Sequence, residues 1–512
     1  MPKDPSTEFA RGEAAEAAGE QTSAAGAGKS FFGHPRGLAT LFFTELWERF
    51  SYYGMRAILI LFMTAPVATG GLAFDITTAG AIYGLYTASV YLLALPGGWV
   101  ADRLMGQRYS VLLGGIIIAC GHFSMAYPVI GTFYLGLVLI AVGTGLLKPN
   151  VSAMVGDLYP EGGARRDAGY SIYYMGINIG AFISPLVCGF LGQRIDWHLG
   201  FAAAGIGMVL GIIQYLMGAK YLGRAGLLEK APLESRHDAR RRRDIRSLIL
   251  GIAVVAVPVL LMATGVLNLS IVELANAGGI FIVGLAVVYF IVTLASRDLK
   301  KTERKRIIVI FILFIAAALF WGAFEQAGSS LNLFAEHQTD MSILGYEFPA
   351  SWLQSINPIF IIIMAPVFAW LWVALGRYEP SSPAKFAFGL VFAGLGFLVM
   401  AWAAIRSQGG SPVSPMWLIV TYFLHTTGEL ALSPVGLSTV TKLSPHRLVG
   451  QMMGVWFMAS ALGNLMAGRV AGFMETLPLS DIFGAVFLTT TIAGLVLALL
   501  SKPITRLMSG VK

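Results

Sequence analysis

The sequence predicts an all-α integral membrane protein with fourteen transmembrane helices. Hydrophobic residues make up 56% of its 512 residues and charged residues only 12%, whereas soluble domains are about 25% charged. Apolar stretches of about 20 residues, long enough to cross roughly 30 Å of hydrocarbon, recur along the chain. Connections rich in Lys and Arg alternate with connections that contain few of them, which is typical of a chain that crosses a membrane repeatedly.

Hydropathy and helix-breaking residues divide the chain into six helices, then two, then six. The first six are expected near 36–65, 79–104, 108–127, 131–158, 168–193 and 199–221. The pair is expected near 245–267 and 274–297, and the last six near 304–336, 350–376, 383–405, 414–444, 446–475 and 480–508. Several of these exceed the length of a perpendicular span, so we expect them to tilt or protrude.

Basic connections set the domain boundaries. The run "ESRHDARRRRDIR" (234–246) separates the first six helices from the pair, and "RDLKKTERKR" separates the pair from the last six. We predict a disordered cytoplasmic tail at 1–30, because this polar segment lacks the apolar core of a signal peptide. The other predicted parts are an N-terminal six-helix bundle (31–222), a basic cytoplasmic linker with an inserted two-helix hairpin (223–303), and a C-terminal six-helix bundle (304–512).

The Lys- and Arg-rich connections also orient the chain. Cytoplasmic connections carry an excess of these residues, which places both termini in the cytoplasm. The net charge of +8 reflects this excess, so we expect membrane lipid rather than nucleic acid as the surroundings of the basic residues.

Cysteine and histidine give no sign of a cofactor site. Cys120 and Cys188 lie inside apolar segments, where we expect inert buried thiols and no disulfide. The histidines show no metal-ligand spacing, and the sequence contains no GxxxxGK[ST] nucleotide motif. We therefore expect no metal and no organic cofactor.

The first apolar run begins with "TELWERFSYYG" (44–54), which places three ionisable residues within five positions. At 100° per residue, with Glu45 at 0°, Glu48 falls at about −60°, Arg49 at +40°, Tyr52 at −20° and Arg56 at +20°. Each unpaired charge at a helix centre costs roughly 2.5–3.5 kcal/mol. This polar face is therefore expected to line a water-filled cavity in which its charges are paired.

Few other ionisable residues lie inside the predicted helices. Lys148 belongs to the first bundle, whereas Glu325 and Glu429 belong to the second. Both bundles thus offer charges to a shared cavity. A membrane enzyme, such as a peptidase or acyltransferase, would need a nucleophile–base or metal constellation, and none occurs in a suitable place. We therefore expect no enzyme, and a non-transporting sensor is a further alternative.

Several motifs resemble those of known transporters. The loop "GGWVADRLMGQR" (97–108) resembles the major facilitator signature between the second and third helices. "ELWERFSYYG" matches the ExxER motif of the proton-dependent oligopeptide transporter (POT) family, and "YYMGINIGAF" (173–182) resembles its fifth-helix signature, with Ala181 where Ser is usual. "LKPN" and "GELALSPVG" also fit this family, and the inserted helix pair is similar to that of its bacterial members.

The resemblance implies a major facilitator fold and a proton-coupled symporter that imports di- and tripeptides by alternating access. It implies a multi-pass protein of the bacterial cytoplasmic (inner) membrane, functional as a monomer, with protons as the coupling ion. The alternative is transport of another small solute on the same scaffold, such as nitrate, a peptide-like drug or a metabolite. Nitrate carriers commonly depart from ExxER, so "ELWER" favours peptides.

The resemblance also assigns roles to individual residues. Basic residues would receive the peptide carboxylate: Arg49, Arg56 and Lys148. Polar and acidic residues would receive its amino end: Asn178, Asn357 and Glu429. Aromatic and hydroxyl side chains would form the walls: Tyr52, Tyr53, Tyr91, Trp321, Ser433 and Trp456.

The resemblance further implies two gates and a proton-coupling group. Arg56–Glu325 would be the outer gate pair and Lys148–Glu429 the inner one, while proton coupling would involve Glu45, Glu48, Arg49 and Glu325. Some relatives have two consecutive acidic residues in the seventh helix, where this chain has Phe324–Glu325. Coupling at that point would then rest on Glu325 alone.

Overall fold

The computed structural model describes residues 30–228, 242–251, 253, 268–343 and 345–510, and these residues are almost entirely helical. The predicted tail (1–30) and the expected helix at 245–267 lie largely outside the described residues, as does most of the basic run at 234–246. Residues 242–251 form a helical segment at the start of the expected helix.

Residues 30–228 contain six long helices. Their bounds are α2 (Arg36–Thr64), α3 (Ile76–Val100), α4 (Gln107–Met125), α5 (Ile130–Asp157), α6 (Gly163–Arg194) and α7 (Trp197–Gly218). Short helical turns flank them: η1 (Val67–Thr69), η2 (Ala101–Met105) and η3 (Ala219–Leu222).

The second half begins with α9 (Ile271–Ala295), the second helix of the predicted hairpin. The later helices are α10 (Lys301–Phe324), α11 (Ser330–Gln338), α12 (Ile356–Leu375), α13 (Ser382–Ser407), α14 (Met416–Leu443), α15 (Val449–Gly472) and α16 (Leu479–Leu507). Short turns join them: η4 (Glu325–Gly328), η5 (Ala350–Ser355), η6 (Gly376–Tyr378), η7 (His446–Leu448) and η8 (Phe473–Glu475). Two short antiparallel strands, β1 (Ser342–Ile343) and β2 (Tyr346–Glu347), pair Ser342 with Glu347.

Eleven helical segments of the described chain are long and apolar enough to cross a membrane. Two more helices, α2 and α14, have 29 and 28 residues but carry the polar and ionisable residues of the predicted site. With the expected span at 245–267, these make the fourteen spans that the sequence predicts.

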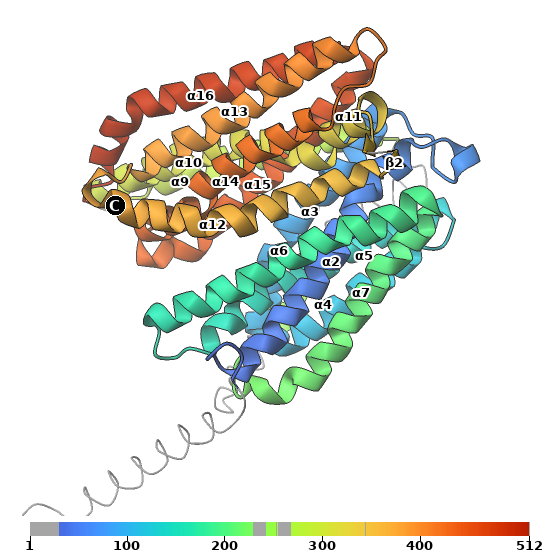
Figure 1. Cartoon of the computed structure of the whole chain (residues 1–512). Helices are drawn as coiled ribbons and strands as arrows, with labels where there is room; N and C mark the ends of the chain where they lie inside the picture. Colours follow the sequence, from blue (N-terminus) through green and yellow to red (C-terminus); the bar gives the residue numbers. More distant parts are fainter. Residues whose placement is uncertain (1–29, 229–241, 252, 254–267, 344, 511–512) are drawn as a thin grey trace, which may run out of the picture.

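The long helices form two groups (Figure 1). In the first group α2 packs against α6 and α7, and α4 against α5 and α7. In the second, α13 packs against α14 and α16, and α10 against α15. Helix α3 joins the groups because it contacts both α5 and α15, and α9 packs on the outside of α3 and α15.

The seventh predicted helix is broken, whereas the sequence pattern predicts one continuous helix over 304–336. Helix α10 ends at Phe324, the turn η4 runs from Glu325 to Gly328, and α11 begins at Ser330. The residue between the last two, Ser329, has φ −124° and ψ −97°, outside the helical region. The break places Glu325 at a helix end that faces the first group.

The signature loop between α3 and α4 is tied to the start of the predicted linker. The Arg108 guanidinium donates hydrogen bonds to the carbonyl oxygens of Gly223 (2.6 Å) and Ala225 (2.7 Å). Arg103 lies 3.8 Å from the Asp244 carboxylate in the helical segment 242–251. The predicted domain boundary at 222 coincides with the end of η3. The predicted boundary at 303 falls inside the first turn of α10. The division into domains stays a prediction.

The two cysteines differ in their surroundings. Cys188 is buried in α6, as expected, but Cys120 is exposed on α4. The expectation of two buried thiols is therefore wrong for Cys120, because apolar residues of a membrane helix also cover its outer surface.

Candidate functional site

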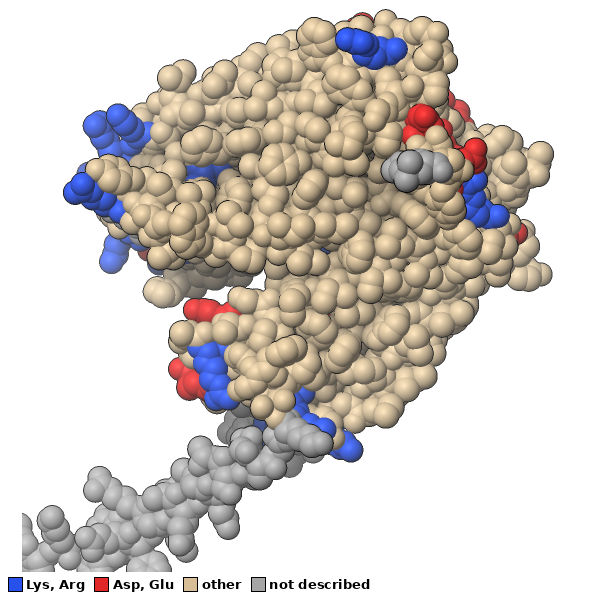
Figure 2. All heavy atoms as spheres, viewed as in Figure 1, with Lys and Arg blue, Asp and Glu red and all other residues tan. Residues whose placement is uncertain are grey.

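A cavity of about 260 Å³ lies between the two helix groups. Figure 2 shows the molecule hollowed between the groups at the end where the C-terminus lies, and Lys and Arg side chains gather around this end. The first group lines the cavity with Glu45, Arg49, Tyr53, Arg56, Tyr91, Lys148, Tyr174 and Asn178. The second group contributes Trp321, Phe324, Glu325, Gln354, Asn357, Tyr422, His425, Glu429 and Ser433.

Helix α2 supplies a buried charge cluster to one side of the cavity. Arg49 Nε lies 2.5 Å from Glu48 Oε2 and 3.1 Å from Glu45 Oε1. The Tyr173 hydroxyl of α6 donates a hydrogen bond to Glu45 Oε2 at 2.7 Å. The spacing of these residues along α2 turns them to one face, and pairing offsets the cost of placing three charges inside the protein. Arg49 is therefore held by two carboxylates.

A second ion pair joins the two groups. Arg56 of α2 pairs with Glu325 of η4, and its Nε donates to the Tyr83 hydroxyl at 2.5 Å. Gly328 allows this approach, because a Cβ atom at that position would overlap the Tyr83 hydroxyl. The helix break at η4 thus brings Glu325 onto Arg56, the pair that the resemblance assigns to the outer gate.

Lys148 and Glu429 each bring one charge to the cavity. Lys148 Nζ lies 4.6 Å from the centroid of the Tyr91 ring, a cation–π contact. Glu429 Oε2 accepts a hydrogen bond of 3.2 Å from Asn357, whose amide also donates to Thr426 at 2.9 Å. Within the described residues neither Lys148 nor Glu429 has an ion-pair partner within 4.0 Å. The predicted inner gate pair is thus open in this conformation.

Most of the predicted binding residues line the cavity, but three predicted site residues do not. Glu48 is fully buried behind Arg49, and Tyr52 packs against Tyr86 with ring centroids 6.5 Å apart. Trp456 packs against Phe386 and fills the space beside Gly436. None of these three side chains lines the cavity in this structure.

Other lining residues were not predicted. Tyr174 lies one helical turn before Asn178, and its carbonyl oxygen accepts a hydrogen bond from the Asn178 amide at 2.9 Å. Gln354 comes from η5, which no sequence pattern identified as part of the site. His425, one turn before Glu429, packs between the rings of Phe324 and Phe397. The four-residue spacing between His425 and Glu429, which puts both on one face of α14, could have indicated that His425 lines the cavity.

The arrangement suits the binding of a small ligand that carries both charges. Basic side chains come from α2 and α5, and acidic ones from α2, η4 and α14, so the cavity presents charges of both signs to a ligand. Tyr53, Tyr91 and Trp321 add aromatic surface with polar edges. Within the part of the chain that the structure describes, no group of three His, Cys, Asp or Glu residues could hold a metal ion.

Comparison with known proteins identifies the family of this chain. The model of the POT family matches residues 108–488, more than half of the chain. The chain belongs to the POT family. It is 44% identical over 499 residues to the peptide transporter YePEPT of Yersinia enterocolitica, with 94% of this chain and 97% of that protein covered.

Further relatives and solved structures extend this likeness over nearly the whole chain. A di-/tripeptide transporter of Lactococcus lactis subsp. cremoris is 35% identical over 495 residues, covering 94% of this chain and 98% of its own length. A crystal structure of a peptide transporter of the POT family in complex with sulfate superposes with a TM-score of 0.89 at 42% identity, covering 96% of this chain and 99% of that one. Both the fold and the sequence are thus those of POT family transporters.

Proposed function

We propose that this protein is a proton-coupled symporter that imports di- and tripeptides across the cytoplasmic membrane by alternating access. The observation that carries this proposal is that Lys148 and Glu429 line one cavity, each without an ion-pair partner among the described residues. A peptide has a carboxylate and an ammonium group about 5–10 Å apart. An unpaired ammonium and an unpaired carboxylate of the protein match these two ends.

Lys148 receives the peptide carboxylate, with Arg49 and Arg56 adding positive potential on the same side. Lys148 is the first contact because the two arginines already pair with carboxylates. Glu429 receives the peptide ammonium group and is held in place by Asn357. Recognition through the two ends of the peptide tolerates varied side chains.

The walls accommodate the rest of the peptide. Trp321 lines the cavity with its indole ring, while its indole N–H is buried and, within the described chain, has no hydrogen-bond partner. Tyr53 and Tyr91 add aromatic surface to the cavity wall, while Asn178 and Ser433 offer further polar contacts. We assign no direct peptide contact to Tyr52 or Trp456 in this conformation.

We infer that the cavity opens toward the cytoplasm. It opens at the end where the C-terminus lies and where Lys and Arg gather (Figures 1 and 2). Cytoplasmic surfaces of membrane proteins carry such an excess of basic residues. This distribution supports a cytoplasmic location for the termini, with the Arg56–Glu325 pair as the closed gate on the opposite side.

Proton coupling acts through Glu325. Protonation of its carboxylate removes the charge that holds Arg56, so the two helix groups can separate on the outer side and the cavity can admit a peptide. Glu45 and Glu48 hold Arg49 in the same cavity and contribute a second site at which protonation frees an arginine. The chain needs no cofactor besides the proton, catalyses no covalent reaction and works as a monomer.

Uptake of labelled dialanine into proteoliposomes tests this function. One proton that moves down 100 mV releases about 2.3 kcal/mol, which supports roughly fiftyfold accumulation of a neutral solute. We expect concentrative uptake when an inward proton gradient is imposed and its loss when a protonophore is added. Correctly inserted protein that takes up no peptide under either condition would refute the proposal.

A further inference from the structure

A second contact between the two helix groups lies beside the Arg56–Glu325 pair. The carbonyl oxygen of Ala57, the next residue of α2, accepts a hydrogen bond from the Asn332 amide of α11 at 2.8 Å. It also accepts a longer one from the Gln354 amide of η5 at 3.3 Å. A carbonyl oxygen has two lone pairs, so α2 can keep its own helical bonding while the second group holds it at this point.

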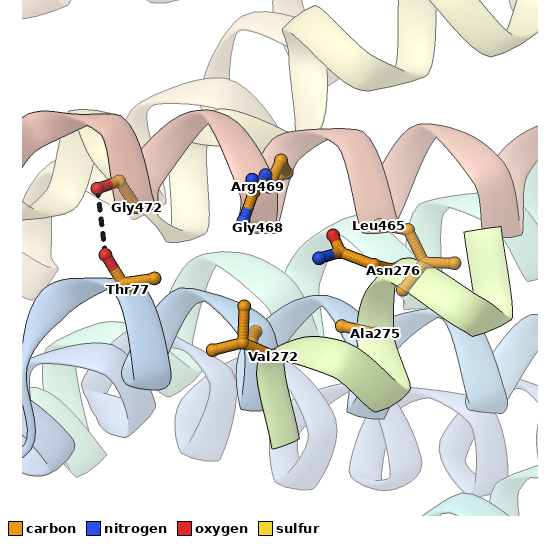
Figure 3. Close-up of a pocket in the computed structure, with 9 residues that line it drawn as sticks. Thr77, Val272, Ala275, Asn276, Leu465, Gly468, Arg469 and Gly472 are labelled. Atoms are coloured by element: carbon orange, nitrogen blue, oxygen red, sulfur yellow. Dashed lines mark hydrogen bonds between the residues drawn. The ribbon is translucent and has the colours of Figure 1, made fainter. Parts of the chain in front are cut away.

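The Asn332 contact is buried, whereas other hydrogen bonds between the groups lie nearer the surface. Asn332 is 1% exposed, and Ala57 is fully buried. By contrast, the half-buried Thr77 of α3 donates from its hydroxyl to the Gly472 carbonyl oxygen of α15 at 3.1 Å (Figure 3). Water cannot compete for a buried hydrogen bond while the groups stay in contact, so the Asn332 bond holds them more firmly than one at the surface.

The helix break at η4 directs the Asn332 amide toward the other group. Asn150 and Asn464 are equally buried, but each donates to the carbonyl oxygen four residues earlier in its own helix. Asn332 is the third residue of α11, and the chain leaves the helical region at Ser329, so it has no such turn behind it. Within the described residues its amide oxygen has no partner. The bond to Ala57 is therefore the polar contact that offsets its burial.

Neither partner of this contact carries a charge. Protonation of Glu325 weakens its pairing with Arg56 but leaves the bond between Asn332 and Ala57 unchanged. Both contacts join neighbouring residues of α2 to the broken helix of the second group, so both must part when the groups separate at this end. The outer gate therefore has one contact that responds to the proton and one that does not.

We propose that Asn332 is a neutral latch of the outer gate, which holds α2 through the Ala57 carbonyl oxygen while this end is closed and releases it when the end opens. This inference rests on the proposed function, because alternating access requires the outer end to open. One neutral hydrogen bond corresponds to about two- to tenfold in an equilibrium constant. The latch thus sets how often the outer end opens once Glu325 is protonated.

The test measures the distance between spin labels on the outer ends of the two groups, by pulsed electron paramagnetic resonance on the full-length protein. Labels at Val67 of η1 and at Gly409 after α13 suit this purpose, because Val67 is exposed and a Cβ atom at Gly409 would meet no neighbouring atom. The exposed Cys120 is replaced by Ser. Asn332→Ala should raise the ratio of open to closed populations about two- to tenfold.

Two further variants separate the lost hydrogen bond from other effects. Asn150→Ala is the matched control, because it removes an equally buried amide that donates to its own helix, and it should leave the ratio unchanged. Asn332→Asp keeps the size of the side chain but, when ionised, offers only acceptor oxygens to the Ala57 carbonyl oxygen. It should raise the ratio even if Asn332→Ala folds poorly.

The effect of the Asn332 variants should persist in the Glu325→Gln protein, in which the ion pair has lost one charge. Unchanged populations in both Asn332 variants would overturn the proposal. An effect that disappears in the Glu325→Gln protein would also overturn it, because Asn332 would then act through the ion pair. The distances are measured without peptide or a proton gradient, so a failure of dialanine uptake alongside the expected shift would count against the proposed function alone.

Discussion

Lys148→Gln removes the ammonium group that we assign to the peptide carboxylate. Because Lys148 has no acidic partner in the described structure, the substitution leaves no protein carboxylate unpaired, and the fold should tolerate it. Arg56→Gln differs, because it would leave buried Glu325 without its partner, which costs about 3–5 kcal/mol. Lys148→Gln therefore isolates the loss of ligand binding.

The expected magnitude follows from the contact that is lost. A hydrogen bond to a charged group contributes about 1.5–3 kcal/mol, which corresponds to roughly 10- to 150-fold in affinity. We expect the half-saturating concentration of dialanine in exchange, measured without a proton gradient, to rise by that factor. Exchange is the right assay because it separates peptide binding from proton coupling.

An amidated peptide tests the assignment to the carboxylate. Dialanine amide lacks the carboxylate, so the wild type should bind it more weakly, whereas Lys148→Gln should bind it no more weakly than the wild type does. If Lys148→Gln weakens the binding of dialanine and of dialanine amide by the same factor, Lys148 does not contact the carboxylate and the reasoning fails.

Three further predictions follow from the same site. Glu325→Gln should keep peptide exchange but reduce proton-driven accumulation from about fiftyfold at 100 mV to near one; full accumulation would contradict the coupling role. Glu429→Gln should weaken the binding of dialanine about tenfold or more, as measured by competition for exchange. The binding of N-acetyl-dialanine, which lacks the ammonium group, should be no weaker in this variant than in the wild type. Gly328→Ala should cost about 1–3 kcal/mol of stability through overlap with Tyr83. Gly279→Ala, inside α9 with no neighbouring atom to meet, should not lower the Tm.

The polar face of α2 could be predicted from the sequence because it depends only on helical spacing. The residues at 45, 49, 53 and 56 line the cavity, as the 100° repeat requires. Because charged side chains are costly in hydrocarbon, these residues predict a water-filled cavity from the sequence alone. Glu48, on the edge of that face, turns instead to the inside of the helix group and reaches the cavity only through Arg49.

The helix break at Glu325 could not be predicted from hydropathy, because apolar residues continue on both sides of it. The signal was the run Gly328–Ser329–Ser330, which permits a break but does not require one. What fixes the break is tertiary: Gly328 packs against Tyr83 and Arg56 from the other helix group. Gln354, Tyr422 and Tyr174 likewise reach the cavity through packing between helices far apart in the sequence.

The sequence does not determine whether Lys148 meets Glu429 or whether Trp456 lines the cavity. The resemblance to the POT family pairs Lys148 with Glu429, yet the two remain apart in this structure. Under the proposed function an inner gate pair forms when the cavity closes, and here the molecule is hollowed between the two helix groups (Figure 2). The residue types could be predicted, but the state of the gate could not.

Movement of protons together with peptide tests the central claim most directly. Proteoliposomes that contain a pH-sensitive dye, held at a fixed inside-negative potential, would be given dialanine at equal pH on both sides. The account predicts acidification of the lumen that begins with dialanine, scales with its uptake and is absent from Glu325→Gln vesicles. Uptake of labelled dialanine by the wild type without any change in lumenal pH would contradict proton-coupled symport.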